Sequence, residues 1–307
     1  MKIKVAFKYV LLVSLAINAG LGALYIKSWA IPRFAKQEKN ALQTSTDTTI
    51  IFDEVNPTNG YKIPVTYGQL GPEMLRSGVI DFDKFSKTYE GSGQPLTDAQ
   101  ISILKQGSNE EITITPENSY FLLNYFWAVG LANQNSILTE GEMAKYGGIK
   151  EAGNFASTGG WSLGKREAMN YYSKQKMILL SSEQQILVEK VSSEIYRPCC
   201  NNSTAFPDCN HGMALLGLLE LMASNGVGED QMFEVAKYVN AYWFPGNYYD
   251  LALYFTNKEG KSFAQVNAQR LLSKEFSSAS GSQVAKQWLV SKGIVAEPPK
   301  TSGGCGV

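Results

Sequence analysis

Residues 119–132 read SYFLLNYFWAVGLA, and no charged side chain interrupts this apolar run. Thr115 and Pro116 stand in front of it, a capping residue followed by the residue favoured at a first helical position. A second apolar run, MALLGLLELMA at 213–223, contains one carboxylate, Glu220, which we expect to face solvent. Two long apolar runs introduced by helix-start signals predict a fold built mainly of α-helices.

The same signals recur along the rest of the chain. The four residues from Thr97 form a capping box that opens a helix ending at Gly107, and the four residues from Ser181 open another. Alternating patterns are scarce, and the only short candidates for β-strands are 111–115 and 176–180. Further helices are expected at about 210–224, 229–243, 248–256, 262–275 and 281–292. The expected fold class is therefore mainly α with little β structure.

Composition excludes several classes of protein. The chain has 307 residues with 28 basic and 28 acidic side chains, 44% hydrophobic residues and 18% charged residues. This balance excludes a disordered chain, and no block of like charge indicates a nucleic-acid-binding arm. Four cysteines are too few for a small domain held together by disulfides, and a single histidine excludes any mechanism that needs two imidazoles.

The N-terminus predicts the location of the chain. Residues 9–26 carry no charge, and Lys2, Lys4 and Lys8 precede them. With the residues that follow, a helix rising about 1.5 Å per residue just spans a hydrocarbon core of about 30 Å. Basic residues on the short side favour a single-pass cell-membrane anchor over residues 1–30, with the bulk of the chain extracytoplasmic. A cleaved signal peptide is the alternative and leaves the same part outside.

Beyond the anchor, we expect three further regions. Residues 31–60 are polar and turn-prone and predict a stalk or linker, residues 61–296 a helical ectodomain, and residues 297–307 a flexible tail that contains Cys305. The first 30 residues hold four lysines and no acid, so residues 31–307 carry 24 basic and 28 acidic side chains, a net charge of −4. A mildly acidic ectodomain excludes nucleic acid as a partner.

The strongest local feature is a cluster of cysteines around the only histidine. Residues 196–213 read YRPCCNNSTAFPDCNHGM and contain Cys199, Cys200, Cys209 and His211. Thiolates with an imidazole are the ligands that Zn, Cu(I) or an iron–sulfur cluster selects. The turn-forming residues between the cysteines allow the loop to fold back on itself, and Cys209 stands where a helix begins, which stabilises a thiolate.

Two other states of the cysteines stay open at this point. Exported thiols oxidise readily, so Cys199 or Cys200 bonded to Cys209 would be a structural disulfide, and the same thiols would also suit thiol–disulfide exchange. Cys305 lies among glycines in the tail, where it has nothing to pack against. We hypothesise that Cys305 is a swinging metal ligand or a resolving thiol for the cluster.

The cysteine loop and the two helical segments after it resemble exported Cys-rich helical modules. These include the small cysteine-motif lipoproteins and, more distantly, the thiol-bearing protein of cytochrome c maturation. The CC-x8-C-x-H spacing differs from the C-x-x-C of the latter. The whole chain also resembles a family of membrane-anchored prokaryotic proteins that end in GGCGV. These resemblances imply metal or thiol chemistry outside the cytoplasm.

The sequence therefore predicts a membrane-anchored metal-binding protein acting in metal handling or electron transfer. Cu(I) or Zn is expected before an iron–sulfur cluster, and a metal-transfer or redox protein is the expected partner. The alternatives are a thiol–disulfide oxidoreductase and a disulfide-stapled ectodomain that binds another protein. No arrangement of residues names a reaction, so the sequence makes no prediction that the chain is an enzyme.

Overall fold

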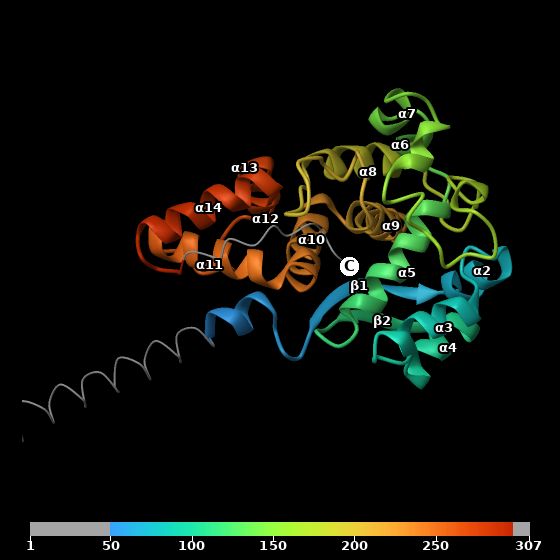
Figure 1. The fold of residues 1–307 in the computed structure, drawn as a ribbon, viewed down its shortest axis with the longest axis horizontal. Coiled ribbons are helices and arrows are strands. Elements are labelled where there is room, and N and C mark those ends of the chain that lie inside the picture. Colours follow the sequence, from blue (N-terminus) through green and yellow to red (C-terminus); the bar gives the residue numbers. More distant parts are fainter. Residues whose placement is uncertain (1–49, 297–307) are drawn as a thin grey trace, which may run out of the picture. The chain divides into compact units, whose positions relative to one another are not determined.

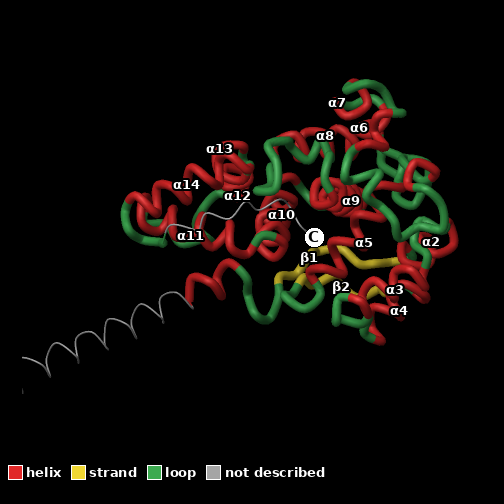
Figure 2. The backbone as a smooth tube through the Cα atoms, in the orientation of Figure 1, coloured by secondary structure: helices red, strands yellow, loops and turns green. Residues whose placement is uncertain are grey.

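The structure is a computed structural model that describes residues 50–296. The predicted anchor, residues 31–49 of the predicted stalk, and the predicted tail with Cys305 lie outside the described residues. The described chain from Ile51 onward belongs to one compact unit that is mainly helical, as Figure 2 shows, which confirms the expected fold class of this part. Within residues 50–296, no helix combines the length and the apolar character needed to cross a membrane.

The elements follow one another in this order. A two-stranded antiparallel sheet is formed by β1 (Tyr61–Gly68) and β2 (Ser108–Ile114). Two short 3-10 helices are η1 (Glu151–Asn154) and η2 (Ala168–Asn170). The α-helices are α2 (Leu70–Ser77), α3 (Phe82–Gly91), α4 (Asp98–Gln106), α5 (Ser119–Ala132), α6 (Ser136–Thr139), α7 (Glu142–Lys145), α8 (Ser182–Glu194), α9 (Asn210–Ser224), α10 (Glu229–Trp243), α11 (Pro245–Glu259), α12 (Ala268–Leu272), α13 (Lys274–Ser277) and α14 (Ala279–Ser291).

Most of the predicted helix boundaries are confirmed. Both capping boxes form, in front of α4 and α8. The prediction was wrong for α5, which begins at Ser119 and not at Pro116. The backbone N–H of Thr115 donates to the Asn118 side chain and that of Asn118 to the Thr115 hydroxyl, a closed turn that delays the helix. The predicted helix at 262–275 is also shorter, because only α12 and α13 are helical there.

The sheet contains one strand that the sequence did not predict and lacks one that it did. The predicted strand at 111–115 is part of β2, but β1 was missed although Ile63, Val65 and Tyr67 alternate along its buried face. Pro64 lies within this strand, although proline donates no ladder hydrogen bond. In the structure the register shifts just after Ile63, so Pro64 lies at an irregularity that tolerates it. Residues 176–180 form no strand.

Helices α5 and α9 cross at the centre of this unit and make its most extensive helix–helix contact (Figure 1). Gly130 of α5 and Gly217 of α9 face each other at the crossing. A Cβ atom on Gly217 would lie 2.6 Å from the Gly130 backbone nitrogen and 2.6 Å from the Phe126 carbonyl oxygen. Because glycine lacks a side chain, the two backbones touch directly, and this contact sets the close spacing of α5 and α9.

From Ile51 onward, the C-terminal end of the predicted stalk is part of the compact unit. Residues 50–55 are helical, and the Val55 side chain is fully buried. The Tyr242 hydroxyl donates a hydrogen bond of 2.6 Å to the Pro57 carbonyl oxygen. The chain that leads into β1 is therefore held against α10.

Candidate metal centre

The loop between α8 and α9 carries the cysteine cluster and is fixed from several sides. Its Thr204 N–H donates to the Ile195 carbonyl at 2.8 Å, which closes the loop on itself. The Ala279 N–H, at the start of α14, donates to the Cys200 carbonyl at 2.8 Å. The Ser157 N–H donates to the Asp208 carbonyl at 3.1 Å. A loop that is closed on itself and tied to two other segments holds its side chains in a set arrangement.

This loop brings the predicted ligands together. The Sγ atoms of Cys199 and Cys209 are 3.4 Å apart, and both cysteines and Cys200 are free thiols. Ligand atoms of Cys199, Cys209 and His211 all lie within 4.8 Å of one another. Donors bound to one ion at about 2.0–2.3 Å lie about 3.5–4 Å apart, so small side-chain movements suffice to form a metal site. Cys305 lies outside the described residues.

A second group of ligands shares one cysteine with the first. Ligand atoms of Cys200, Asp208 and Cys209 also lie within 4.8 Å of one another, but no such group among the described residues joins Cys200 to His211. The Cys200 Sγ atom is 3.7 Å from the Asp208 carboxylate. Cys209 is therefore the common member of two candidate ligand sets.

A buried arginine organises the centre. Arg197 is fully buried, and its guanidinium donates to the Cys209 Sγ at 3.0 Å and to the Asp208 carboxylate at 2.7 Å. It also donates to the carbonyl oxygens of Asn202 and Phe206 at 3.0 and 3.3 Å. A buried cation needs such partners, and N–H···S bonds of this kind orient a thiolate ligand. Arg197 thus holds the loop in place and also orients the Cys209 sulfur.

The Cys209 sulfur is positioned to be a thiolate. Hydrogen bonds from the Cys199 and Cys200 thiols hold the pKa of the Cys209 thiol well below its usual value, and the charge of Arg197 adds to this effect against the cost of burial. Cys209 is also the N-cap of α9, where its Sγ accepts the Gly212 N–H at 3.4 Å. The predicted position at a helix start is confirmed, and it supplies a negatively charged soft ligand.

The other two thiols keep their protons more strongly. The pKa of Cys199 is raised by its hydrogen bonds to Cys200 and Cys209, with burial adding to the rise. For Cys200, the hydrogen bond with Cys199 lowers the pKa, but the hydrogen bond to Cys209 and burial raise it to about 11. One thiolate therefore serves as acceptor for two neutral thiols, and a metal ion would replace their protons.

Aromatic rings shield the histidine. The His211 ring lies 4.4 Å from the Phe244 ring and 5.8 Å from the Trp243 ring, measured between ring centres. These aromatics lie at the end of α10 and the start of α11. These two rings cover part of the imidazole surface.

A glycine makes room for the arginine. A Cβ atom on Gly212 would collide with the guanidinium of Arg197, whose Nε would be only 2.9 Å away. Gly212 belongs to the first turn of α9 and has no left-handed backbone angle. Its small size, and not its flexibility, is what the site requires.

Sequence reasoning missed Arg197, Asp208 and Gly212, although all three lie in the quoted stretch. Arginine and aspartate near cysteines are common surface residues, and nothing in the spacing showed that this arginine is buried. Only the folded loop brings the guanidinium against the sulfur. Trp243 and Phe244 come from a distant segment, and no local pattern linked them to His211.

Glu220, further along α9, contradicts the prediction that it faces solvent. It is fully buried, and the Asn133 and Asn135 side-chain amides donate to its two carboxylate oxygens at 3.1 and 2.5 Å. The side-chain oxygens of these asparagines already accept backbone N–H groups, those of Met177 and Ile137 among them, which fixes the amide orientation. The apolar residues on both sides of Glu220 were the sequence signal that this whole part of α9 is buried.

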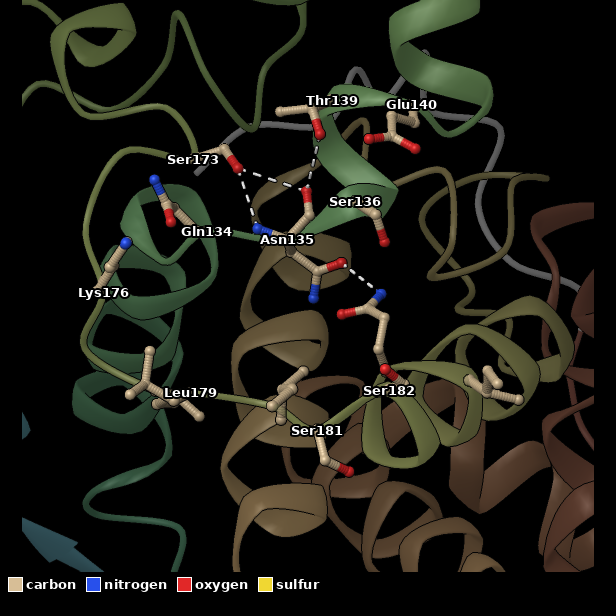
Figure 3. A pocket seen from close by; sticks show the side chains of 14 residues that line it. Gln134, Asn135, Ser136, Thr139, Glu140, Ser173, Lys176, Leu179, Ser181 and Ser182 are labelled. Carbon is tan, nitrogen blue, oxygen red and sulfur yellow. Dashed lines mark hydrogen bonds between the residues drawn. The ribbon is translucent and has the colours of Figure 1, made fainter.

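The Glu220 network extends to a hollow of about 620 Å³. Figure 3 shows Asn135 and Ser173 at this hollow, where the Asn135 N–H donates to the Ser173 hydroxyl at 3.0 Å. The Gln185 side chain donates to the Asn135 side-chain oxygen at 3.0 Å. The network therefore ties α9 to the segment before α6 and to the first turn of α8, whereas the cysteine loop begins after the last turn of α8.

Burial of Glu220 predicts a pH-dependent stability. Burial raises the pKa of Glu220 from 4.5 to about 8, against the lowering effect of its hydrogen bonds from Asn135 and Asn133. Since the folded-state pKa is the higher one, its stabilising contribution is complete below about pH 4.5 and is lost as the pH rises through about 8. The Glu220→Gln variant cannot lose a proton, so its stability should not fall over this range.

The measurement is urea denaturation of the native chain and Glu220→Gln from pH 5 to pH 9. At pH 5 the variant should be less stable than the native chain by about 1 kcal/mol. The side-chain NH2 group of the introduced glutamine would face the side-chain NH2 group of Asn133 or Asn135, and two donors form no hydrogen bond with each other. At pH 9 it should be the more stable chain. If the unfolding free energies of the two chains ran parallel from pH 5 to pH 9 without crossing, the pKa of Glu220 would not differ between the folded and unfolded states.

No family model, no curated protein and no solved structure matches this chain. The function is therefore argued from the cluster itself.

Proposed function

We propose that the chain is a metal-binding protein whose ion is held by Cys199, Cys209 and His211. One observation carries the proposal: two sulfurs and one imidazole lie within 4.8 Å of one another in a loop that other elements fix. Arg197 and the Gly212 N–H stabilise the Cys209 thiolate before any ion arrives. A preformed set of soft donors binds a soft ion without a large cost in ordering.

Cu(I) fits this ligand set better than Zn. Two thiolates and one imidazole satisfy a three-coordinate soft ion, whereas structural Zn sites take four protein ligands. Cys200 is not grouped with His211, so a fourth ligand for Zn would have to come from elsewhere, and Cys305 of the tail is the candidate. An iron–sulfur cluster, with four cysteine ligands as its usual requirement, is the weakest fit.

The proposed role is metal handling outside the cytoplasm. The uncharged segment 9–26 supports a membrane anchor, and the net charge of −4 beyond it suits a protein that receives cations. The partner would be a metal-transfer or redox protein that presents its own thiolates. Transfer of an ion, without turnover of a substrate, requires no further catalytic group.

A thiol–disulfide oxidoreductase is the second candidate. The 3.4 Å separation of the Cys199 and Cys209 sulfurs and the lowered pKa of Cys209 favour it. A thiolate next to a second thiol is the arrangement needed for reversible disulfide formation. The same two sulfurs serve both functions, so one preparation tests both.

The test is to purify the full chain anaerobically, measure its metal content and free thiols, and titrate the metal-free chain with Cu(I) and with Zn(II). We expect one Cu(I) ion per chain, bound more tightly than Zn(II), and thiols that react slowly once the metal is bound. A chain that binds neither ion and cycles between dithiol and disulfide at a moderate potential would favour the second candidate. Cysteines that stay bridged under reductant would contradict both.

A further inference from the structure

The two ligand groups are half-buried but differ in the side chains that surround them, and this difference bears on the role of Cys200. The His211 side is covered by the rings of Trp243 and Phe244. A hollow of about 610 Å³ borders the cysteine loop and is lined by Asn201, Asn202 and Ser203 of that loop, among other residues. The Cys200 Sγ atom is 3.8 Å from the carbonyl oxygen of Asn202.

The Cys200 side is also the weaker place for an ion to stay. Asp208 already binds the Arg197 guanidinium through one carboxylate oxygen at 2.7 Å and accepts the Asn202 side-chain amide through the other at 2.8 Å. An ion between Cys200, Asp208 and Cys209 would therefore compete with Arg197 and Asn202 for the Asp208 oxygens. No such competing pair occupies the Cys199 and His211 donors within the described residues.

Because Cys209 belongs to both groups, an ion can move between them without becoming free. We infer that Cys200, with Cys209 and Asp208, forms a transit position through which a metal ion passes between a thiolate-bearing partner and the resident site at Cys199, Cys209 and His211. This inference rests on the proposed function. It adds a second metal position and a direction of approach, through the hollow beside Asn202.

The exchange is balanced without any oxidant. The bonds from the Cys200 sulfur and the Asp208 carboxylate to the ion form as the bonds from the Cys199 sulfur and the His211 nitrogen break. The proton that leaves the Cys200 thiol goes to the released Cys199 thiolate. The ion keeps its oxidation state, and Cys209 remains bound throughout. A partner thiolate then replaces the remaining protein ligands in the same way.

The test measures two quantities, the affinity for the ion and the rate at which the ion is transferred. The full chain, loaded with one Cu(I) ion under anaerobic conditions, is mixed with a chromogenic Cu(I) chelator, and the rate of transfer is followed by absorbance. In Cys200→Ser, we expect the Cu(I) affinity to change by less than about threefold and the transfer rate to fall at least about tenfold. Ser203→Ala is the matched control, because it lies in the same loop and lines the same hollow.

Each outcome is decisive. An unchanged transfer rate in Cys200→Ser contradicts the inference. So does a large loss of affinity, since Cys200 would then be a resident ligand. Thermal unfolding of both metal-free variants identifies any loss of fold, and Cys200→Ala repeats the test if serine disturbs the loop. If the native chain binds no Cu(I) in the preceding titration, the proposed function has failed and the inference falls with it, which is distinct from a kinetic failure.

Discussion

Cys209→Ser is expected to weaken Cu(I) binding at least about a hundredfold. The Cys209 sulfur is shared by both candidate ligand groups, and it is the thiolate that Arg197 and the Gly212 N–H stabilise. A hydroxyl is a hard donor that stays protonated, so it replaces neither the charge nor the softness of the thiolate. With one of three soft ligands lost, the two that remain bind the ion more weakly.

Serine is the informative replacement because it is itself a favoured N-cap residue. Helix α9 should therefore still begin at Asn210, and the variant should keep its helical circular dichroism. Binding is measured by competition with a Cu(I) chelator of known affinity, alongside Cys200→Ser, which should bind nearly as the native chain does. Equal affinities for Cys209→Ser and the native chain would rule out the proposed ligand set.

Gly130→Ala is expected to destabilise the fold by about 3 kcal/mol. The added methyl group would collide with the Met213 carbonyl oxygen of α9 and lie 3.0 Å from the Gly217 nitrogen. These are backbone atoms of a neighbouring helix, so they move only if α5 and α9 separate and their packed side chains lose contact. Alanine favours a helix over glycine by about 1 kcal/mol, which offsets part of this cost.

Gly246→Ala is the matched control for this substitution. Gly246 also lies in a helix, α11, but it is exposed and an added Cβ would meet no atom within 4 Å. Urea denaturation of the metal-free chains should show Gly130→Ala strongly destabilised and Gly246→Ala unchanged or slightly more stable. Equal stabilities would mean that the α5–α9 crossing tolerates a wider spacing.

Local signals were sufficient for elements whose ends depend on neighbouring residues. The capping boxes before α4 and α8 involve side chains three positions apart, so the sequence contains everything that determines them. The predicted start of α5 was wrong because Thr115 and Asn118 hydrogen-bond to each other before the helix begins. Strand β1 was not predicted because it is stabilised by pairing with β2, whose residues lie 40 or more positions further along the chain.

In the candidate site too, features set by neighbouring residues were predictable and features set by distant residues were not. The spacing of Cys199, Cys200, Cys209 and His211 along the chain predicted one common ligand set, and the turn-forming residues between them predicted the fold-back. The structure groups three of these four residues and places Cys200 in a second group with Asp208 and Cys209. The burial of Arg197 was not predictable, because it depends on the loop closing around the guanidinium. The burial of Glu220 depends on two asparagines nearly 90 residues earlier in the chain, which only the packing of α5 against α9 brings near.

The contact between Gly212 and Arg197 has an evolutionary consequence. A side chain at position 212 and a guanidinium at position 197 compete for the same space. In any related chain that builds this centre, the two positions are expected to covary, with glycine required at 212 wherever arginine is kept at 197. A larger residue at 212 becomes tolerable only after the arginine is lost, and that order of substitutions makes the pair a marker for recognising distant relatives.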